Sequence, residues 1–152
     1  MASIGQRLWK AGNTASTWMY RRTGGRVGGR VRGVPVLLLT VAGRRTGARH
    51  TTPVGYFERD GSYYLAASAG GRPAEPQWIR NLRAATHASV QIGREHHEVT
   101  VEVLHGAERD AAWADLVVAR APFFAAYETK AGRTIAVARL TPTPRPTPTQ
   151  TP

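Results

Sequence analysis

Cysteine is absent from the 152-residue chain, which excludes disulfide bonds, thiolate metal ligands and cysteine nucleophiles. The chain also lacks any apolar run near the roughly 20 residues of a membrane-spanning helix, and its N-terminus lacks the apolar segment of a signal peptide. Acidic side chains are missing from the first 57 residues, which hold ten Lys or Arg. These absences predict a cytoplasmic protein of one domain whose N-terminal third faces an anionic partner.

The motifs of metal-dependent and hydrolytic enzymes are missing as well. His96 and His97 are neighbours on a predicted strand, so their side chains point to opposite faces and cannot share a metal ion. Residues 66–70 lack the leading glycine of a nucleophile elbow, and neither a Walker loop nor a GxGxxG motif occurs. The sequence therefore predicts no metal site, and an enzyme of this composition needs an organic cofactor to supply its chemistry.

What the chain does have is an excess of arginine. Its net charge is +11, with 21 basic and 10 acidic side chains, and only two of the basic residues are lysines. A planar guanidinium binds phosphate or carboxylate bidentately, which an ammonium group cannot do. Three arginines gather in residues 43–53, Gly-Arg-Arg-Thr-Gly-Ala-Arg-His-Thr-Thr-Pro, between two apolar runs. A turn with these guanidinium and backbone N–H groups is suited to hold a polyanion.

Hydrophobic periodicity and turn residues predict a mainly β (α+β) domain over residues 34–140. Residues 34–42 form a continuous apolar run typical of a buried strand, while Asp60-Gly61 and Gly93 mark hairpin turns. The predicted strands are 34–42, 51–57, 62–68, 89–92, 95–105 and 134–140. The predicted helices of this domain are 77–84, 108–121 and 122–130. Strands joined mostly by hairpins favour a small antiparallel barrel over a doubly wound parallel sheet.

The segments outside this domain have distinct compositions. Residues 1–22 place apolar side chains at helical spacing among basic ones, which predicts an amphipathic helix that either packs on the domain or lies on an anionic membrane surface. Residues 23–33 are too rich in glycine for a helix or a stable strand and predict a flexible connector. They also look like Arg-Gly-Gly segments that bind RNA. The Thr-Pro repeats of residues 141–152 predict an extended, disordered tail.

A series of short motifs resembles the deazaflavin-dependent nitroreductase family of actinobacteria. These are small split β-barrel proteins that use coenzyme F420, an 8-hydroxy-5-deazaflavin. The motifs occur in family order over most of residues 14–140. They are Thr-Trp-Met-Tyr-Arg-Arg (17–22), Pro-Val-Leu-Leu-Leu-Thr (35–40), Gly-Arg-Arg-Thr-Gly (43–47), Ala-Ala-Ser-Ala-Gly-Gly (66–71), Pro-Gln-Trp-Ile-Arg-Asn-Leu (76–82) and Val-Gln-Ile (90–92). Gly-Arg-Arg-Thr-Gly alone is common, whereas this series is specific.

The resemblance implies a set of cofactor-binding and substrate-binding residues. Arg44, Arg45 and Thr46 match the positions that hold the phosphodiester and glutamate tail of the cofactor, and Arg49, His50 and Pro53 complete this part of the site. Ala66, Ala67, Ser68 and Ala69 match the segment that lines the deazaflavin ring, and Trp78 and Asn81 match the helix that closes over it. The implied substrate pocket consists of Trp18, Ser68, Phe123, Phe124 and Tyr127.

Four positions depart from the family pattern. His50 stands where the nitro-activating members tend to have Arg, and Ala69 stands where Lys is familiar. Gly55 and Ala121 stand where aromatic residues are familiar. The substrate pocket has thus lost polar aromatic groups, so the reduction of nitroimidazoles does not follow from the resemblance.

We expect an oxidoreductase that passes a hydride from reduced coenzyme F420 to a quinone, a nitro compound or another activated small-molecule acceptor. One alternative keeps the fold but binds FMN, whose single phosphate would use fewer of the arginines. A second alternative is a basic module that binds nucleic acid or an anionic membrane, although the resemblance leads us to expect no nucleic-acid partner. If the N-terminal helix binds lipid, the protein lies at the inner face of the membrane. The sequence leaves the oligomeric state open.

Overall fold

The computed structural model describes residues 4–144, with side chains from residue 14 onward. Seven strands form one antiparallel sheet in the order β1-β2-β3-β4-β7-β6-β5, and a pairing between β2 and β5 closes six of them into a barrel. The strands are β1 (Arg30–Val31), β2 (Val34–Ala42), β3 (Arg49–Arg59), β4 (Ser62–Ala66), β5 (His87–Ile92), β6 (Glu95–Val103) and β7 (Val137–Pro142). The mainly β, antiparallel barrel with a few helices is therefore confirmed.

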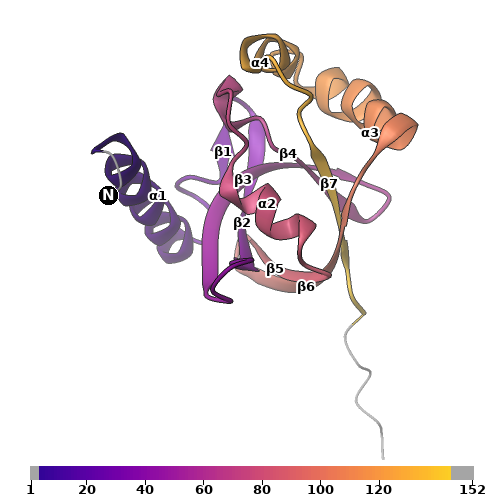
Figure 1. The fold of residues 1–152 in the computed structure, drawn as a ribbon. Coiled ribbons are helices and arrows are strands. Elements are labelled where there is room, and N and C mark those ends of the chain that lie inside the picture. The colour runs from indigo at the N-terminus through magenta and orange to yellow at the C-terminus, as the bar shows by residue number, and fades with distance from the viewer. Residues whose placement is uncertain (1–3, 145–152) are drawn as a thin grey trace, which may run out of the picture.

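The helices are α1 (Ile4–Thr23), α2 (Gln77–Arg83), α3 (Gly106–Ala112) and α4 (Phe124–Ala131), together with a 3₁₀ turn η1 (Ala69–Gly71) and a π-helical segment η2 (Trp113–Val118) that continues α3. Helices α1, α3 and α4 pack against the outside of the barrel, whereas α2 lies across one end and contributes Ile79 and Leu82 to the interior (Figure 1). Helix α1 lies beside β2 and β3, whereas α3 and α4 lie close together on another side of the barrel (Figure 1). The described residues contain no helix that is long and apolar enough to cross a membrane.

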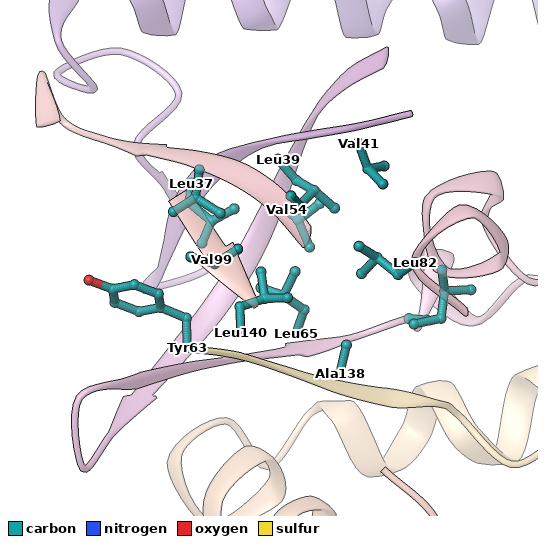
Figure 2. Close-up of a cluster of buried hydrophobic side chains, with 14 of the residues drawn as sticks. Leu37, Leu39, Val41, Val54, Tyr63, Leu65, Leu82, Val99, Ala138 and Leu140 are labelled. Carbon is teal, nitrogen blue, oxygen red and sulfur yellow. The ribbon is translucent and has the colours of Figure 1, made fainter. Parts of the chain in front are cut away.

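Side chains on one face of β2 point into the barrel, and side chains on its other face pack against α1. Leu37, Leu39 and Val41 belong to the interior cluster, in which side chains from the surrounding strands meet (Figure 2). Their neighbours Val36 and Leu38 are also buried, but they form a separate cluster with Tyr20 of α1. Because side chains alternate along a strand, burial of both faces requires the uninterrupted apolar sequence that this segment has.

Tyr20 is the side chain that attaches α1 to the barrel. It is 1% exposed, and its hydroxyl accepts the Gly93 N–H at 2.8 Å and donates to the Gln91 carbonyl at 3.4 Å. Both partners lie at the turn between β5 and β6, far along the chain. The C-terminal part of α1 therefore packs on the domain, yet Trp18 and Met19 beside Tyr20 remain 57% and 37% exposed.

The glycine-rich connector contains a strand, so the expectation that no stable strand would form there was wrong. Val31 pairs with Val34 and Arg30 pairs with Pro35 in a tight hairpin. Its two turn residues, Arg32 and Gly33, have φ angles of 52° and 81°, the left-handed conformation that two-residue hairpin turns require. The short segment is stable because its backbone groups form hydrogen bonds with the exposed edge of β2.

The tail prediction was wrong at its first residues. Thr141 and Pro142 belong to β7, and the Thr143 N–H donates to the Glu98 carbonyl at 2.9 Å. Pro142 is tolerated because it is the last residue of the strand, and the neighbouring residues make the hydrogen bonds. Residues 145–152 lie outside the described part of the chain. At the other end, β7 begins at Val137 rather than at 134, after a loop that follows α4.

Candidate active site

The basic turn between β2 and β3 is closed by its own hydrogen bonds. The Gly43 N–H donates to the Ala48 carbonyl at 2.7 Å, and the Gly47 N–H donates to the Gly43 carbonyl at 2.8 Å. The Ala48 N–H donates to the Thr46 hydroxyl at 3.2 Å. The side chains of Arg44 and Arg45 are exposed at the tip of this turn. The compact turn therefore presents both arginines to solvent.

Arg44 connects this turn to helix α2. Its backbone N–H donates to Oδ1 of Asn81 at 3.2 Å, and its Nη1 donates to the same oxygen at 2.9 Å and to Oε1 of Gln77 at 3.0 Å. Asn81 is 6% exposed, so its amide oxygen is directed at the turn from inside the protein. The structure therefore brings Arg44 and Asn81 together, and Asn81 accepts hydrogen bonds from the turn that carries the arginines.

Arg49 and His50 lie on opposite faces of β3 because they are adjacent in the strand. Arg49 is on the outer face, where its Nη2 donates to the Ser89 hydroxyl at 3.3 Å, and that hydroxyl donates to Glu98 at 2.7 Å. His50 lies on the other face with its imidazole beside Gly43, so close that a Cβ at Gly43 would be 3.1 Å from Nε2. His50 thus supports the turn, whereas Arg49 is directed across the outer surface.

The outer face of β3 borders a cavity beneath α1. Thr51 shares this face with Arg49, and its hydroxyl lies 2.8 Å from the Thr40 hydroxyl and 3.3 Å from Nη2 of Arg21. A cavity of about 320 Å³ is lined by Thr14, Thr17, Trp18, Arg21 and Thr51. Trp18, one of the substrate-pocket residues implied by the resemblance, therefore lines an actual recess next to the strand that follows the basic turn.

The floor of this face continues to Gly55. Residues 51, 53 and 55 share one side of β3, and Gly55 contributes no side chain above it; a Cβ there would lie 3.2 Å from Cγ1 of Val34. Tyr56 pairs with Leu65, so one step further along the strands Gly55 is opposite Ala66. Pro53 and Gly55 are partly exposed on this face, whereas Ala66 is 7% exposed and packs in a cluster with residues of α3, η2 and α4.

The segment after β4 has an unusual backbone. Ser68 is right-handed, and Ala69, Gly70 and Gly71 follow with φ angles of 47°, 64° and 83°. A right-handed residue followed by a left-handed one turns successive N–H groups toward the same side, which creates a concave surface for an anion. Left-handed alanine is uncommon and persists where neighbouring contacts hold it, often at functional sites.

The three aromatic residues of the implied substrate pocket have different surroundings. Phe124 is 8% exposed and contacts Phe57 and Trp113, with ring centroids 5.7 and 6.3 Å apart, so it belongs to the core. Phe123 and Tyr127 are half-buried, with ring centroids 5.8 Å apart. These two, rather than Phe124, present aromatic surface that a ligand can reach.

Comparison with known proteins identifies the family. The sequence profile of the F420H(2)-dependent quinone reductase family matches residues 13–142. An F420H(2)-dependent quinone reductase of Mycobacterium tuberculosis is 32% identical over 126 residues, which cover 81% of this chain and 85% of the relative. The chain belongs to the F420H(2)-dependent quinone reductase family. It is accordingly an oxidoreductase whose cofactor is coenzyme F420, as the motif series implied.

Solved structures agree with this assignment. An F420-H2 dependent reductase superimposes with a TM-score of 0.62 at 36% identity, over 70% of this chain and 93% of the other. A domain-swapped dimer superimposes with a TM-score of 0.65 at 31% identity, over 84% of this chain and 94% of the other. The split barrel of this chain is thus the fold on which a member of the same group of reductases is built.

A second cavity is lined by none of the residues expected to bind the cofactor. It measures about 260 Å³ and is lined by residues of β6, α3 and the loop before β7, with Arg83 at its rim. Its arginines already have carboxylate partners. Arg83 binds both oxygens of Glu75 at 2.6 Å, and Arg109 binds Glu128 at 2.7 Å. The hydrogen bond from Arg83 holds the pKa of Glu75 below its ordinary value, so Glu75 stays ionised and paired.

Two arginines near the expected site were missed by the sequence analysis. Arg32, in the β1–β2 turn, lies over Phe123 and donates to the Tyr127 hydroxyl at 2.8 Å. Arg133, after α4, donates to backbone carbonyls of residues 67–74. Nothing local distinguishes either from the other arginines of the chain, because both act on segments more than 50 residues away.

Trp78 is half-buried and packs against the barrel core.

Proposed function

We propose that this member of the family binds reduced coenzyme F420 along the outer face of β3 and passes a hydride from it to a quinone. The proposal rests on the order in which three surfaces occur along that face. The basic turn with Arg44 and Arg45 comes first, the partly exposed Pro53 and Gly55 follow with Val34 packed beside Gly55, and the strained segment after β4 lies beyond. The cavity beside Trp18 adjoins this face at Thr51.

The residues at the basic turn fit the charges of the cofactor. Its phosphodiester and glutamate tail need cations and N–H donors, and Arg44, Arg45, Thr46 and Arg49 supply both at the solvent-exposed start of β3. Each well-aligned, charge-assisted hydrogen bond contributes about 1.5–3 kcal/mol, which exposure and salt reduce. Asn81 holds Arg44 in place, so the turn is ordered before the cofactor arrives.

The chain needs to supply orientation rather than an acid or a base. The bound deazaflavin supplies a hydride from C5 and behaves like a nicotinamide, since carbon replaces nitrogen at that ring position. The partly exposed Ser68 and Ala69 would line the ring, with the buried Ala66 and Ala67 behind them, and the backbone N–H groups at Ala69 and Gly70 would stabilise its negative charge in the oxidised form. Phe123 and Tyr127 bound the acceptor side and exclude water. Ser68 lies between the two surfaces and can donate to either ligand.

A quinone is the acceptor best supported by the relatives, whose names give that activity. Exposed Trp18 and Met19, together with Arg21 and Arg22, also suit contact with an anionic membrane, where apolar quinones dissolve. We propose that the acceptor reaches the site from the membrane through this contact.

The proposal is tested in two independent steps. Fluorescence quenching of oxidised coenzyme F420 by the purified protein measures binding, and we expect saturation at micromolar concentration. Oxidation of reduced cofactor in the presence of a soluble quinone measures turnover, with FMN in place of the deazaflavin as the control. Binding without turnover would refute the quinone as acceptor, and absence of binding would refute the cofactor site.

Flotation with vesicles tests the membrane contact separately. The protein should float with vesicles that contain anionic lipid and remain behind with neutral ones, and Trp18→Ala should reduce the floating fraction. Equal recovery with both kinds of vesicle would remove the membrane from the proposal and leave the reaction unaffected.

A further inference from the structure

The guanidinium of Arg133 is surrounded by backbone carbonyls from one short segment. It donates to five carbonyl oxygens at distances of 3.1–3.4 Å. These belong to Ala67, Ser68, Arg72, Pro73 and Ala74. A guanidinium has five N–H donors in a rigid planar fork, and this one uses all three nitrogens on residues 67–74. The contacts cross more than 58 positions of sequence, so they fix how the segment sits on the barrel.

The charge of Arg133 is not used in an ion pair. None of the ion pairs formed within residues 14–144 involves it. The hydrogen bond from Arg83 is the main cause of the lowered pKa of Glu75 and the charge of Arg133 adds to it, but both carboxylate oxygens of Glu75 bind Arg83 at 2.6 Å. Arg133 is half-buried, so its positive charge is only partly screened by solvent. The positive field therefore acts on the peptide groups of residues 67–74 and on whatever lies against them.

The direction of the carbonyls determines the direction of the neighbouring N–H groups. All described peptide bonds are trans, and in a trans peptide the C=O and the following N–H point in opposite directions. The Ser68 carbonyl accepts the Gly71 N–H at 2.8 Å and lies 3.4 Å from Nη2 of Arg133, so the Ala69 N–H points away from both donors. Ala69 has a φ of 47°, a conformation that the chain does not adopt readily without such support.

The end of α4 sets Arg133 in position for this role. Gly132 caps the helix in the left-handed conformation, and its N–H donates to the Glu128 carbonyl at 3.2 Å. One turn earlier, the stem of Lys130 lies over Gly71, where a Cβ would come within 2.9 Å of Cδ, and its Nζ lies 3.4 Å from the Gly70 carbonyl. The last turn of α4 and the residue after its cap thus both hold the segment that follows β4.

We propose that Arg133 is a positioning residue for the cofactor. It fixes the peptide planes of Ala67 and Ser68 so that the Ala69 N–H faces the deazaflavin ring, and its charge stabilises the negative charge of that ring. The inference rests on the proposed function for the location of the cofactor. The effect of Arg133 on the segment itself does not depend on that location, which allows the two to be tested apart.

The test compares Arg133→Gln and Arg133→Lys with the matched control Arg120→Gln. Arg120 is an exposed arginine that donates to a single backbone carbonyl, that of Glu58 at 2.7 Å. Amide hydrogen exchange of the cofactor-free protein reports on residues 67–74. We expect exchange there to accelerate about tenfold or more in both Arg133 variants, because lysine keeps the charge but lacks the fork, and to stay unchanged in the control.

Affinity for oxidised coenzyme F420, measured by fluorescence quenching, completes the test. We expect Arg133→Gln to bind at least about tenfold more weakly and Arg133→Lys to bind with intermediate affinity, since it retains the charge. Unchanged exchange in both variants overturns the positioning role. Faster exchange with unchanged affinity overturns the role toward the cofactor and, with it, the proposed placement of the ring. If Arg133→Gln does not fold, Arg133→Lys decides both comparisons.

Discussion

The guanidinium carbon of Arg32 lies 4.1 Å from the ring centroid of Phe123, within the range of a strong cation–π contact. The same guanidinium donates to the Tyr127 hydroxyl at 2.8 Å. These contacts join the tip of the β1–β2 hairpin to α4, and both aromatic rings belong to the proposed acceptor site. The hairpin that the sequence analysis took for a flexible connector therefore reaches the site itself.

Arg32→Ala should raise the KM for the quinone several-fold while the affinity for coenzyme F420 stays nearly constant. Loss of the guanidinium releases Phe123 and Tyr127 but does not touch the basic turn. Steady-state kinetics and a cofactor titration measure the two effects. Arg26→Ala is the matched control, an exposed arginine in the same segment. A cofactor affinity that falls as much as the acceptor KM rises would show that Arg32 supports the fold as a whole.

Arg44→Ala and Arg45→Ala should each weaken cofactor binding about tenfold or more, because each removes a charge-assisted contact. The structure adds a distinction between them. Arg44 also binds Asn81 and Gln77 of α2, so its variant should lower the melting temperature, whereas Arg45→Ala should leave it unchanged. Fluorimetric titration and thermal melts decide this. If neither variant alters affinity while both stay folded, the basic turn does not hold the anionic tail.

FMN should bind at least about tenfold more weakly than coenzyme F420. It has one phosphate and no glutamate tail, so it leaves part of the cluster of Arg44, Arg45 and Arg49 without a partner. Calorimetry with both ligands under the same salt concentration gives the comparison. Equal or tighter binding of FMN would contradict the role assigned to this cluster.

Two truncations should show separately how much the last strand and the tail contribute to stability. Ending the chain after Pro144 should leave the melting temperature unchanged, because residues 145–152 consist only of Arg, Pro, Thr and Gln and offer no large apolar side chain to a core. Ending it after Leu140 should lower the melting temperature by several degrees, since Thr141 pairs with Thr100 in β7 and Thr143 donates twice to the Glu98 carbonyl. Identical melts for both truncations would show that residues 141–144 add no stability.

Stability should decline at alkaline pH through buried tyrosines. Burial raises the pKa of Tyr20, with a smaller opposing effect from its bond to Gly93, and burial also raises the pKa of Tyr56 and Tyr63. Below about pH 10 these groups are protonated in both states. Above it the unfolded chain ionises first, so the free energy of unfolding falls as pH rises.

Tyr20→Phe provides the check on this pH dependence. It should lower the free energy of unfolding by about 1–3 kcal/mol at neutral pH, because the Gly93 N–H loses its partner. It should also make the alkaline decline shallower, since one titrating group is gone. Chemical denaturation at a series of pH values measures both effects. An equally steep decline in the variant would show that Tyr20 does not contribute to it.

Much of the barrel and the basic turn follow from local sequence. The apolar run of β2 predicts a strand that is buried on both faces, and the hairpin turn at Asp60 and Gly61 predicts a strand on either side of it. Both predictions use only residues that are neighbours in sequence. The turn of residues 43–48 is closed by hydrogen bonds among its own residues. Because these features are local, the fold class and the family could be inferred before any contact was known.

The contacts that arrange the site depend on segments that meet only in the folded chain. Arg32 meets Tyr127 across 95 positions, Tyr20 meets Gly93 across 73, and Arg133 meets Ala67 across 66. No local pattern marks these residues, since each looks like any other arginine or tyrosine until the barrel closes. Even β1 forms only because β2 offers an unpaired edge. Sequence alone therefore determined which elements form and where the charge lies, and the tertiary structure decided which side chains hold the site, because that choice is made by contacts between distant segments.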